Sequence, residues 1–360
     1  MATVKPRVSI GMPVFGGETH LRASIQSVIN QNFRDWELIL LDDCSPDRSL
    51  DVIDTFQDER ILLLRNASNQ GLVAARNRIM DESTGEFLAW LDQDDLAFPD
   101  RIATQVQFLE RHPHVSVCGS FTETLMEQRG LPSRVRLEVF PKSHHAIRAS
   151  MAFLNPMACN TVTMRLKDFR ERGLTFRPEF GNSLDYDMWS QASDRLLFEN
   201  IPRPLGAYRV HPQQTSQGAA LEVMNQQAIR VQVELIERSL QIPISTDQRS
   251  LHASATIAPL DIHDAEHLQE IASWLASLRQ ANLRHRAFDV EAFDQMLVRQ
   301  WTTCLLAVRP TMDRAAFARS AALGTRRIHP KVRSAMVCLV SGVRRRRIQR
   351  TRPAVPRTDF

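Results

Sequence analysis

Short apolar runs alternate with segments of helical periodicity over the first hundred residues, and this alternation constrains the fold more than any other feature of the chain. Near-continuous apolar strands joined by helices are typical of a mostly parallel sheet covered on both faces. Ligands bind such sheets at the carboxyl ends of the strands. We therefore expect an α/β fold with strands at 8–14, 36–41, 61–64 and 87–91, and helices at 21–30, 49–56 and 72–80.

The rest of the chain changes character twice. Residues 120–215 mix short strands and loops with one helix near 185–192, and helical periodicity dominates from about residue 218. One apolar stripe in this last part fits a core or an interface better than a cofactor site; it consists of Leu268, Ile271, Trp274, Leu275 and Leu278. We expect a catalytic domain over 1–217, a helical region over 218–325 and a basic tail over 326–360.

Three carboxylates stand directly after the apolar segment 87–91, at Asp92, Asp94 and Asp95. Carboxylates at the end of a buried strand are unfavourable unless something neutralises them. A divalent metal would neutralise them and could also hold a diphosphate. The alternative is a strand that simply ends in a polar loop.

Two further segments of the same half carry polar groups at strand ends. Asp42 and Asp43 end the second apolar run, where they could contact a nucleobase or ribose, or could belong to a helix N-cap. Gly71 begins a helix that presents Arg76 and Asn77 one turn later. Arg76 could contact a diphosphate or form a structural salt bridge. The chain contains no Walker A loop and no G-x-G-x-x-G after the first strand, so metal and side chains would have to hold a phosphate ligand.

In order and spacing, these segments resemble family 2 of the inverting glycosyltransferases, which have the nucleotide-sugar-binding GT-A fold. The matching pieces are 8–15, 37–47, 69–77 and 85–95. The resemblance is strong over 7–120, the expected nucleotide-sugar half, and looser over the expected acceptor side at about 120–217. It does not extend to the C-terminal helices. It implies a Rossmann-like, mostly parallel sheet flanked by helices.

The resemblance also implies roles for individual residues on the donor side. Asp94 would bind Mn²⁺ or Mg²⁺, with Asp92 beside the ribose and metal. Asp95 would orient sugar hydroxyls, and Arg76 would lie near the base or phosphates of the donor. The base itself would be hydrogen-bonded by Asp42 or Asp43 in a pocket lined by Pro13, Val14 and Phe15.

The family further implies a catalytic carboxylate in a Glu-Asp-x-Asp pattern before an apolar helix. This chain has Leu184 in place of the first acid, so Asp185 is the candidate general base and Asp187 the second choice. Asp185 could also serve as a helix N-cap. Near the end of the domain the family often has Arg-x-His, here Arg209 and His211. Arg209 would help to bind the donor and His211 would ligate the metal, although a histidine in a loop can equally be a surface residue.

Together these features predict a metal-dependent transferase that moves a sugar from a nucleoside-diphosphate sugar, with UDP favoured, to a hydroxyl acceptor. We expect a glycan or lipid-linked acceptor in the synthesis of cell-surface polysaccharide or glycolipid. A nucleotidyltransferase is less consistent, because the loop 16–20 lacks the basic residue that its phosphate loop would need. A catalytically inactive scaffold of the same fold is the other alternative, and Leu184 is the departure that keeps it open.

Composition constrains the compartment. The five cysteines are widely spaced, without metal-binding or disulfide patterns, which favours a reducing cytoplasm. No N-terminal signal is expected, and no window reaches the roughly 18 apolar residues of a bilayer span.

Residues 326–360 contain eleven Lys or Arg and one acid, a net charge of +10, whereas the whole chain has a net charge of +4. The segment 334–352 could contact anionic lipid at the inner membrane face, or could be a solvated tail. Nucleic acid is not expected, because aromatic residues do not interleave with the arginines.

Overall fold

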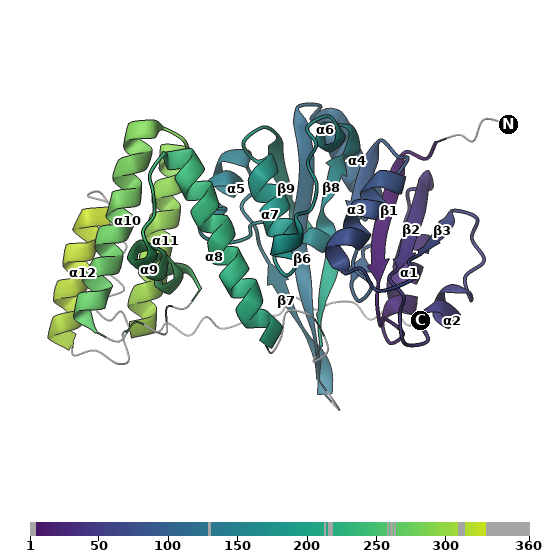
Figure 1. Cartoon of the computed structure of the whole chain (residues 1–360), viewed down its shortest axis with the longest axis horizontal. Helices are drawn as coiled ribbons and strands as arrows, with labels where there is room; N and C mark the ends of the chain where they lie inside the picture. Colours follow the sequence, from purple (N-terminus) through teal and green to yellow (C-terminus); the bar gives the residue numbers. More distant parts are fainter. Residues whose placement is uncertain are drawn as a thin grey trace, which may run out of the picture.

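The computed structural model describes residues 5–128, 131–211, 214, 219–257, 259, 262, 264–308 and 314–328. Figure 1 shows a sheet flanked by helices, followed by a bundle of helices at one end of the molecule. The segment 334–352, with its expected membrane contact, lies outside the described residues. Within them, no helix combines the length and apolar character needed to cross a bilayer.

The first half of the chain forms the parallel strands that the alternation predicted. They are β1 (Val8–Val14), β2 (Trp36–Asp42), β3 (Ile61–Arg65) and β4 (Phe87–Trp90). Their order in the sheet is β3-β2-β1-β4, with every pair parallel. In this register Val14 lies opposite Asp42. The carboxyl ends of β1 and β2 therefore lie side by side at one edge of the sheet. β4 pairs with the other side of β1, so its carboxyl end lies at the same edge.

The second half of the sheet is mixed, which refines the expectation of a mostly parallel sheet. It adds β5 (Leu96–Ala97), β6 (Val115–Gln128), β7 (Leu131–Glu138), β8 (Thr163–Arg165) and β9 (Leu197–Val210). β8 pairs antiparallel with β4 and β6, β9 runs parallel to β6, and β7 pairs antiparallel with β6. This half follows from long-range pairing that the looser pattern of 120–215 did not specify.

Alternate residues of the strands point into two separate cores. On β2, Ile39 and Leu41 join one core, and Leu38 and Leu40 join the other. Helices cover both faces, as a buried parallel sheet requires. They are α1 (Leu21–Ile29), α2 (Ser49–Ile53), α3 (Leu72–Glu82), α4 (Arg101–Arg111), α5 (His144–Ser150), α6 (Leu166–Arg170) and α7 (Leu184–Ala192), with two 3₁₀ turns at Cys159–Thr161 and Pro178–Phe180.

The C-terminal region is helical, as expected. It comprises α8 (Ala219–Leu240), α9 (Thr246–Thr256), α10 (Ala265–His285), α11 (Val290–Val308) and α12 (Arg314–Ile328). Of these, α9 was not predicted, although Ser245 and Gln248 form a capping box at its start. The stripe that begins at Leu268 is fully or almost fully buried, which confirms its assignment to a core. That core is continuous with one face of the sheet, because Phe153 contacts Phe293 of α11 at a ring separation of 5.6 Å.

Two histidines, one fully buried and one partly buried, make the stability of this fold pH-dependent. Burial lowers the pKa of His252 from 6.5 to about 4, and burial followed by the charge of Arg148 lowers that of His144 to about 4. Between these pKa values the unfolded chain binds protons that the folded chain excludes. The free energy of unfolding should therefore fall between pH 7 and pH 5, by about 2 kcal/mol for the fully buried His252 and by less for the partly exposed His144.

The His252→Gln variant tests this expectation. Glutamine can still accept the hydrogen bond that Trp274 donates to Nδ1 of His252 at 3.3 Å, but it does not titrate. Urea unfolding at pH 7 and pH 5 should show a smaller loss of stability in the variant than in the unchanged chain. An equal loss in both proteins would contradict the role given to His252.

Candidate active site

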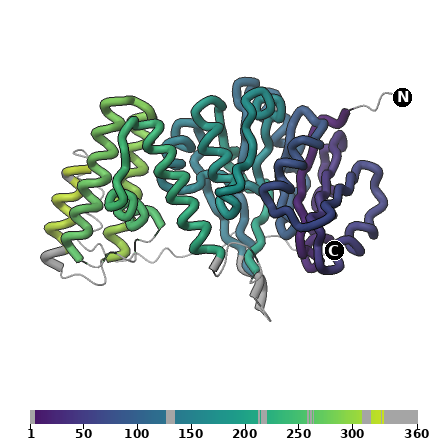
Figure 2. The backbone as a smooth tube through the Cα atoms, viewed as in Figure 1, coloured from purple at the N-terminus to yellow at the C-terminus, as the bar shows by residue number. Residues whose placement is uncertain are grey.

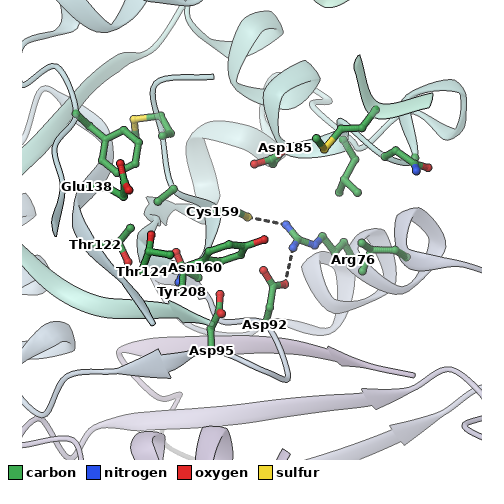
Figure 3. A pocket seen from close by; sticks show the side chains of 18 residues that line it. Arg76, Asp92, Asp95, Thr122, Thr124, Glu138, Cys159, Asn160, Asp185 and Tyr208 are labelled. Atoms are coloured by element: carbon green, nitrogen blue, oxygen red, sulfur yellow. Dashed lines mark hydrogen bonds and ion pairs between the residues drawn. The ribbon is translucent and has the colours of Figure 1, made fainter. Parts of the chain in front are cut away.

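A pocket of about 330 Å³ lies beyond the carboxyl end of β4, between the sheet and α7. It collects residues from both halves of the domain, as Figure 3 shows. Four predicted site residues line it: Arg76, Asp92, Asp95 and Asp185. The other lining residues are Leu72, Thr122, Thr124, Glu138, Phe140, Met157, Ala158, Cys159, Asn160, Gly181, Asn182, Leu184, Tyr208 and Met224.

The carboxylates that follow β4 have unequal surroundings. Asp92 keeps 32% of its side-chain surface exposed and pairs with Nη2 of Arg76 at 2.7 Å. Burial of this region raises the pKa of Asp92, which Arg76 only partly offsets. Asp95 is completely buried, and one of its oxygens accepts the backbone N–H of Arg209 at 2.9 Å. Burial, followed by the charges of Asp94 and Asp92, raises the pKa of Asp95 well above its ordinary value. The ionised form of this cluster is therefore disfavoured in the protein alone, and a bound cation would stabilise it.

Arg76 forms the salt bridge that was one of its two predicted roles. Its side chain is 4% exposed, and it donates from Nη1 to Sγ of Cys159 at 2.6 Å as well as from Nη2 to Asp92. Burial raises the pKa of the Cys159 thiol to about 12, so this group is neutral at pH 7. Burial alone would lower the pKa of Arg76. The carboxylates of Asp92 and Asp185 outweigh that effect and keep the guanidinium charged.

Asp94 and His211 come together although 117 residues separate them. Nε2 of His211 lies 3.0 Å from Oδ2 of Asp94, and its ring centroid lies 4.7 Å from that of His20. Nδ1 of His211 is buried without a hydrogen-bond partner among the described residues. Among the residues that the structure describes, no group of three or more His, Cys, Asp or Glu side chains converges as a metal site. The arrangement nevertheless fits Mg²⁺ or Mn²⁺, which proteins often hold through one or two side chains plus substrate phosphates.

The residues predicted to bind the donor base lie at the ends of β1 and β2, apart from the pocket lining. Pro13 and Val14 are buried in β1, and Phe15 is 46% exposed just beyond it. Asp43 accepts hydrogen bonds from Asn66 and from the backbone of Gln70 and Gly71, at 2.6 to 3.1 Å. Asp42 has one buried oxygen without a hydrogen-bond partner among the described residues. Asp43 therefore holds the loop that leads into α3, whereas the other carboxylate oxygen of Asp42 accepts the backbone N–H of Ser45 at 3.2 Å.

The two acids of α7 have different roles in the structure. Asp185 lines the pocket, and Nδ2 of Asn155 donates to its Oδ2 at 3.0 Å. Asp187 is 1% exposed, does not line the pocket, and binds the guanidinium of Arg177 through both of its oxygens, at 2.5 and 2.9 Å. The geometry therefore favours Asp185 as the group that meets a substrate, and Asp187 as a structural ion pair.

Several residues with contacts at the site had no sequence signal. Gln93 stands between the predicted carboxylates, and its side-chain amide accepts the backbone N–H of Phe15 at 2.9 Å and donates to the backbone carbonyl of Phe15 at 3.0 Å. Glu138, Asn182 and Tyr208 line the pocket from segments without periodic pattern.

Arg209, which was predicted to bind the donor, is not among the residues that line the pocket. Its Nε donates to the backbone carbonyl of Asp94 at 2.9 Å. This contact ties the end of β9 to the acidic loop.

Comparison with known proteins agrees with this geometry. The sequence profile of the family described as Glycosyl transferase family 2 matches residues 9–173. An uncharacterized glycosyltransferase of Haemophilus influenzae is 32% identical over 218 residues, which cover 59% of this chain and 68% of the relative. The chain belongs to glycosyltransferase family 2. About a third of the length of this relative lies outside the aligned region.

Two further similarities extend this result. A putative teichuronic acid biosynthesis glycosyltransferase of Bacillus subtilis, TuaG, is 30% identical over 193 residues, covering 52% of this chain and 73% of TuaG. The structure of residues 1–349 of S. aureus TarS in complex with UDP-GlcNAc superposes with a TM-score of 0.55 at 16% identity, covering 88% of this chain and 90% of that one. At this low identity, the structural similarity supports the GT-A fold alone.

The contrast between the two acids of α7 gives a stability prediction. Asp187→Asn should lower the free energy of unfolding by about 1–3 kcal/mol, because it weakens a buried pair whose partner Arg177 stays charged. Asp185→Asn should change it by less than about 1 kcal/mol, because Asp185 faces the pocket. Urea denaturation of both variants would measure the difference. A larger loss for Asp185→Asn would contradict the assignment.

Proposed function

We propose that this protein is a metal-dependent inverting glycosyltransferase that moves a sugar from a nucleoside-diphosphate sugar to a hydroxyl acceptor. The observation that carries the proposal is the convergence of Asp92 and Asp95 with Asp185 in one pocket, beside the pair of Asp94 and His211. An acidic donor side and a separate carboxylate across the pocket are what one-step inversion requires.

In the proposed reaction, the acceptor hydroxyl enters the pocket from the side of α7. Asp185 takes the proton of this hydroxyl as its oxygen forms a bond to the anomeric carbon. The bond between that carbon and the phosphate oxygen breaks on the opposite face, and its electron pair leaves with the nucleoside diphosphate. Asn155 holds Asp185 in place through the hydrogen bond to Oδ2. No covalent enzyme intermediate is needed.

Asp94 and His211, with Asp92 beside them, would hold Mn²⁺ or Mg²⁺ together with the donor diphosphate. When bound, the ion offsets the negative charge that develops on the departing phosphate. Arg76 would hold Asp92 in a fixed orientation, while Asp95, which is fully buried and fixed by the backbone of Arg209, would orient the sugar hydroxyls. The exposed ring of Phe15 would contact the nucleobase of the donor, and Asp42 or Asp43 would form a hydrogen bond with that base.

A UDP-sugar is the favoured donor, and the UDP-GlcNAc bound to the similarly folded TarS supports that choice. The similarity to TuaG supports a role in the synthesis of cell-surface polysaccharide or glycolipid, with a glycan or lipid-linked acceptor. The inactive-scaffold alternative rested on Leu184. Leu184 lines the pocket beside Asp185, and the convergence of Asp92, Asp95 and Asp185 in that pocket supports the enzyme over the scaffold.

Donor binding tests the metal assignment. We expect calorimetry with a panel of nucleotide sugars to detect binding that Mn²⁺ strengthens. Asp94→Ala should weaken the Mn²⁺-dependent binding at least about tenfold, or about 1.4 kcal/mol. The control Asp81→Ala removes an exposed acid at the end of α3, outside the pocket, and should bind as the unchanged chain does.

Two results would count against this part of the proposal. Absence of binding to every donor, with and without metal, would remove the support for a nucleotide-sugar transferase. Unchanged Mn²⁺-dependent binding by Asp94→Ala would show that the metal is held elsewhere.

Turnover tests the catalytic base. Asp185→Asn should lower the release of nucleoside diphosphate by about 10²–10⁴-fold, the usual contribution of a general base. Donor affinity should stay within about threefold, because Asp185 meets the acceptor rather than the diphosphate. Asp168→Asn, on α6 and outside the pocket, is the matched control. Full turnover by Asp185→Asn would exclude Asp185 as the base.

A further inference from the structure

The strand β7 forms an open edge of the sheet. Among the described residues it pairs only with β6, in a register that places Thr122 opposite Glu138 and Thr124 opposite Arg136. Figures 1 and 2 show the hairpin of β6 and β7 projecting from the body of the molecule. The backbone groups on the outer side of such a strand have no neighbouring strand, which makes them a template for pairing with another chain.

The side chains of this edge are sorted by face. Val135 and Leu137 of β7 and Val139, the residue directly after it, alternate along one face and are 59%, 50% and 64% exposed. Arg136 and Glu138 lie on the other face, where Nε of Arg136 is 3.0 Å from Oε1 of Glu138. An edge strand usually carries charges or proline, which prevent association. β7 contains Pro132 and carries the charges of Arg136 and Glu138 on one face, but the opposite face is apolar and exposed, which favours a partner.

Two copies of the segment 135–139 are complementary to each other when they pair antiparallel. In a two-fold antiparallel pair centred on Leu137, each Val135 lies opposite Val139 of the partner subunit, and the two Leu137 side chains face each other. On the other face each Arg136 lies opposite Glu138 of the partner subunit. Apolar pairs and opposite charges at facing positions both stabilise antiparallel strands. Centring the pair on Arg136 would instead place two arginines opposite each other.

We propose that two copies of this chain associate through β7, in an antiparallel register centred on Leu137 that joins their sheets into one. The interface would be isologous, because the same strand serves both copies. Glu138 lines the pocket, so the association would bring Arg136 of the partner subunit to the rim of the pocket. The proposal does not depend on the donor or on the reaction.

Light scattering on the full chain provides the first measurement. The expected mass is twice 41.1 kDa, decreasing toward a single chain on dilution. Leu137→Lys should shift the mass to a single chain, because it places two ammonium groups opposite each other. Leu137 is half exposed, so the variant should fold, and circular dichroism checks that it does. A single-chain mass for the unchanged protein at every concentration would overturn the proposal, as would a dimer that Leu137→Lys leaves intact.

Cysteine cross-linking tests the register. Facing Cα atoms in an antiparallel pair are about 4.5–5.5 Å apart, within the range of a disulfide. In a Cys44→Ser/Cys338→Ser background, which removes the exposed thiol of the described residues and the one that lies outside them, Leu137→Cys should form a disulfide-linked dimer under mild oxidation. The matched control Val135→Cys should not, because in this register its two copies would lie about 14 Å apart. Equal cross-linking of the two variants would overturn the register.

A charge exchange tests the polar face independently. Arg136→Glu should weaken the dimer by placing glutamates opposite each other, and so should Glu138→Arg by placing arginines opposite each other. The double variant should restore the dimer, because each pair is then reversed. Failure of the double variant to recover would contradict the pairing. Loss of vesicle binding in Leu137→Lys, from a protein that is a single chain in solution, would identify the apolar face as a lipid contact and overturn the proposal.

Discussion

The guanidinium of Arg76 is almost completely buried, and both halves of the domain meet around it. It comes from α3, pairs with Asp92 after β4, contacts Cys159 from the second half, and lies over the rings of Trp90 and Phe176 at 5.2 and 5.7 Å. A buried ion pair adds little net stability, because desolvation opposes the attraction between the charges. The pair matters for the geometry of the site instead. It holds Asp92, the first carboxylate of the acidic loop, in one orientation and places the positive charge of Arg76 between Asp92 and Asp185.

The features that could be predicted from the sequence are those that local patterns specify. The strands β1, β2 and β4 are buried on both faces and β3 is partly buried, so their apolar runs identified all four, and β2 and β4 ended where a polar cluster began. The positions of Asp42, Asp43 and the loop 92–95 at strand ends followed from that reading. Asp185 followed from the family resemblance, and the structure places it in the same pocket as Asp92.

Other features depend on contacts between distant residues, which no local pattern encodes. The pair of Asp94 and His211 joins positions 117 residues apart, and only the pairing of β9 with β5 and β6 brings them together. The family pattern ranked Asp185 before Asp187 as candidate base but left both open, and in the structure Arg177 separates them by binding Asp187. The helix α9 lacks a strong apolar stripe, so its capping box was its main signal.

The C-terminal helices act on the candidate site through α7. Asn182 donates its backbone N–H to Gln227 of α8 at 2.8 Å, and Ser183 donates its hydroxyl to the carbonyl of Met224 at 3.0 Å. Arg177 bridges Asp187 of α7 and Glu234 of α8, the latter at 2.9 Å. Each contact holds the first turn of α7, which presents Asp185 to the pocket. Because the orientation of Asp185, the proposed general base, depends on its helix, α8 belongs to the structural support of the candidate site, although the sequence resemblance ends before α8 begins.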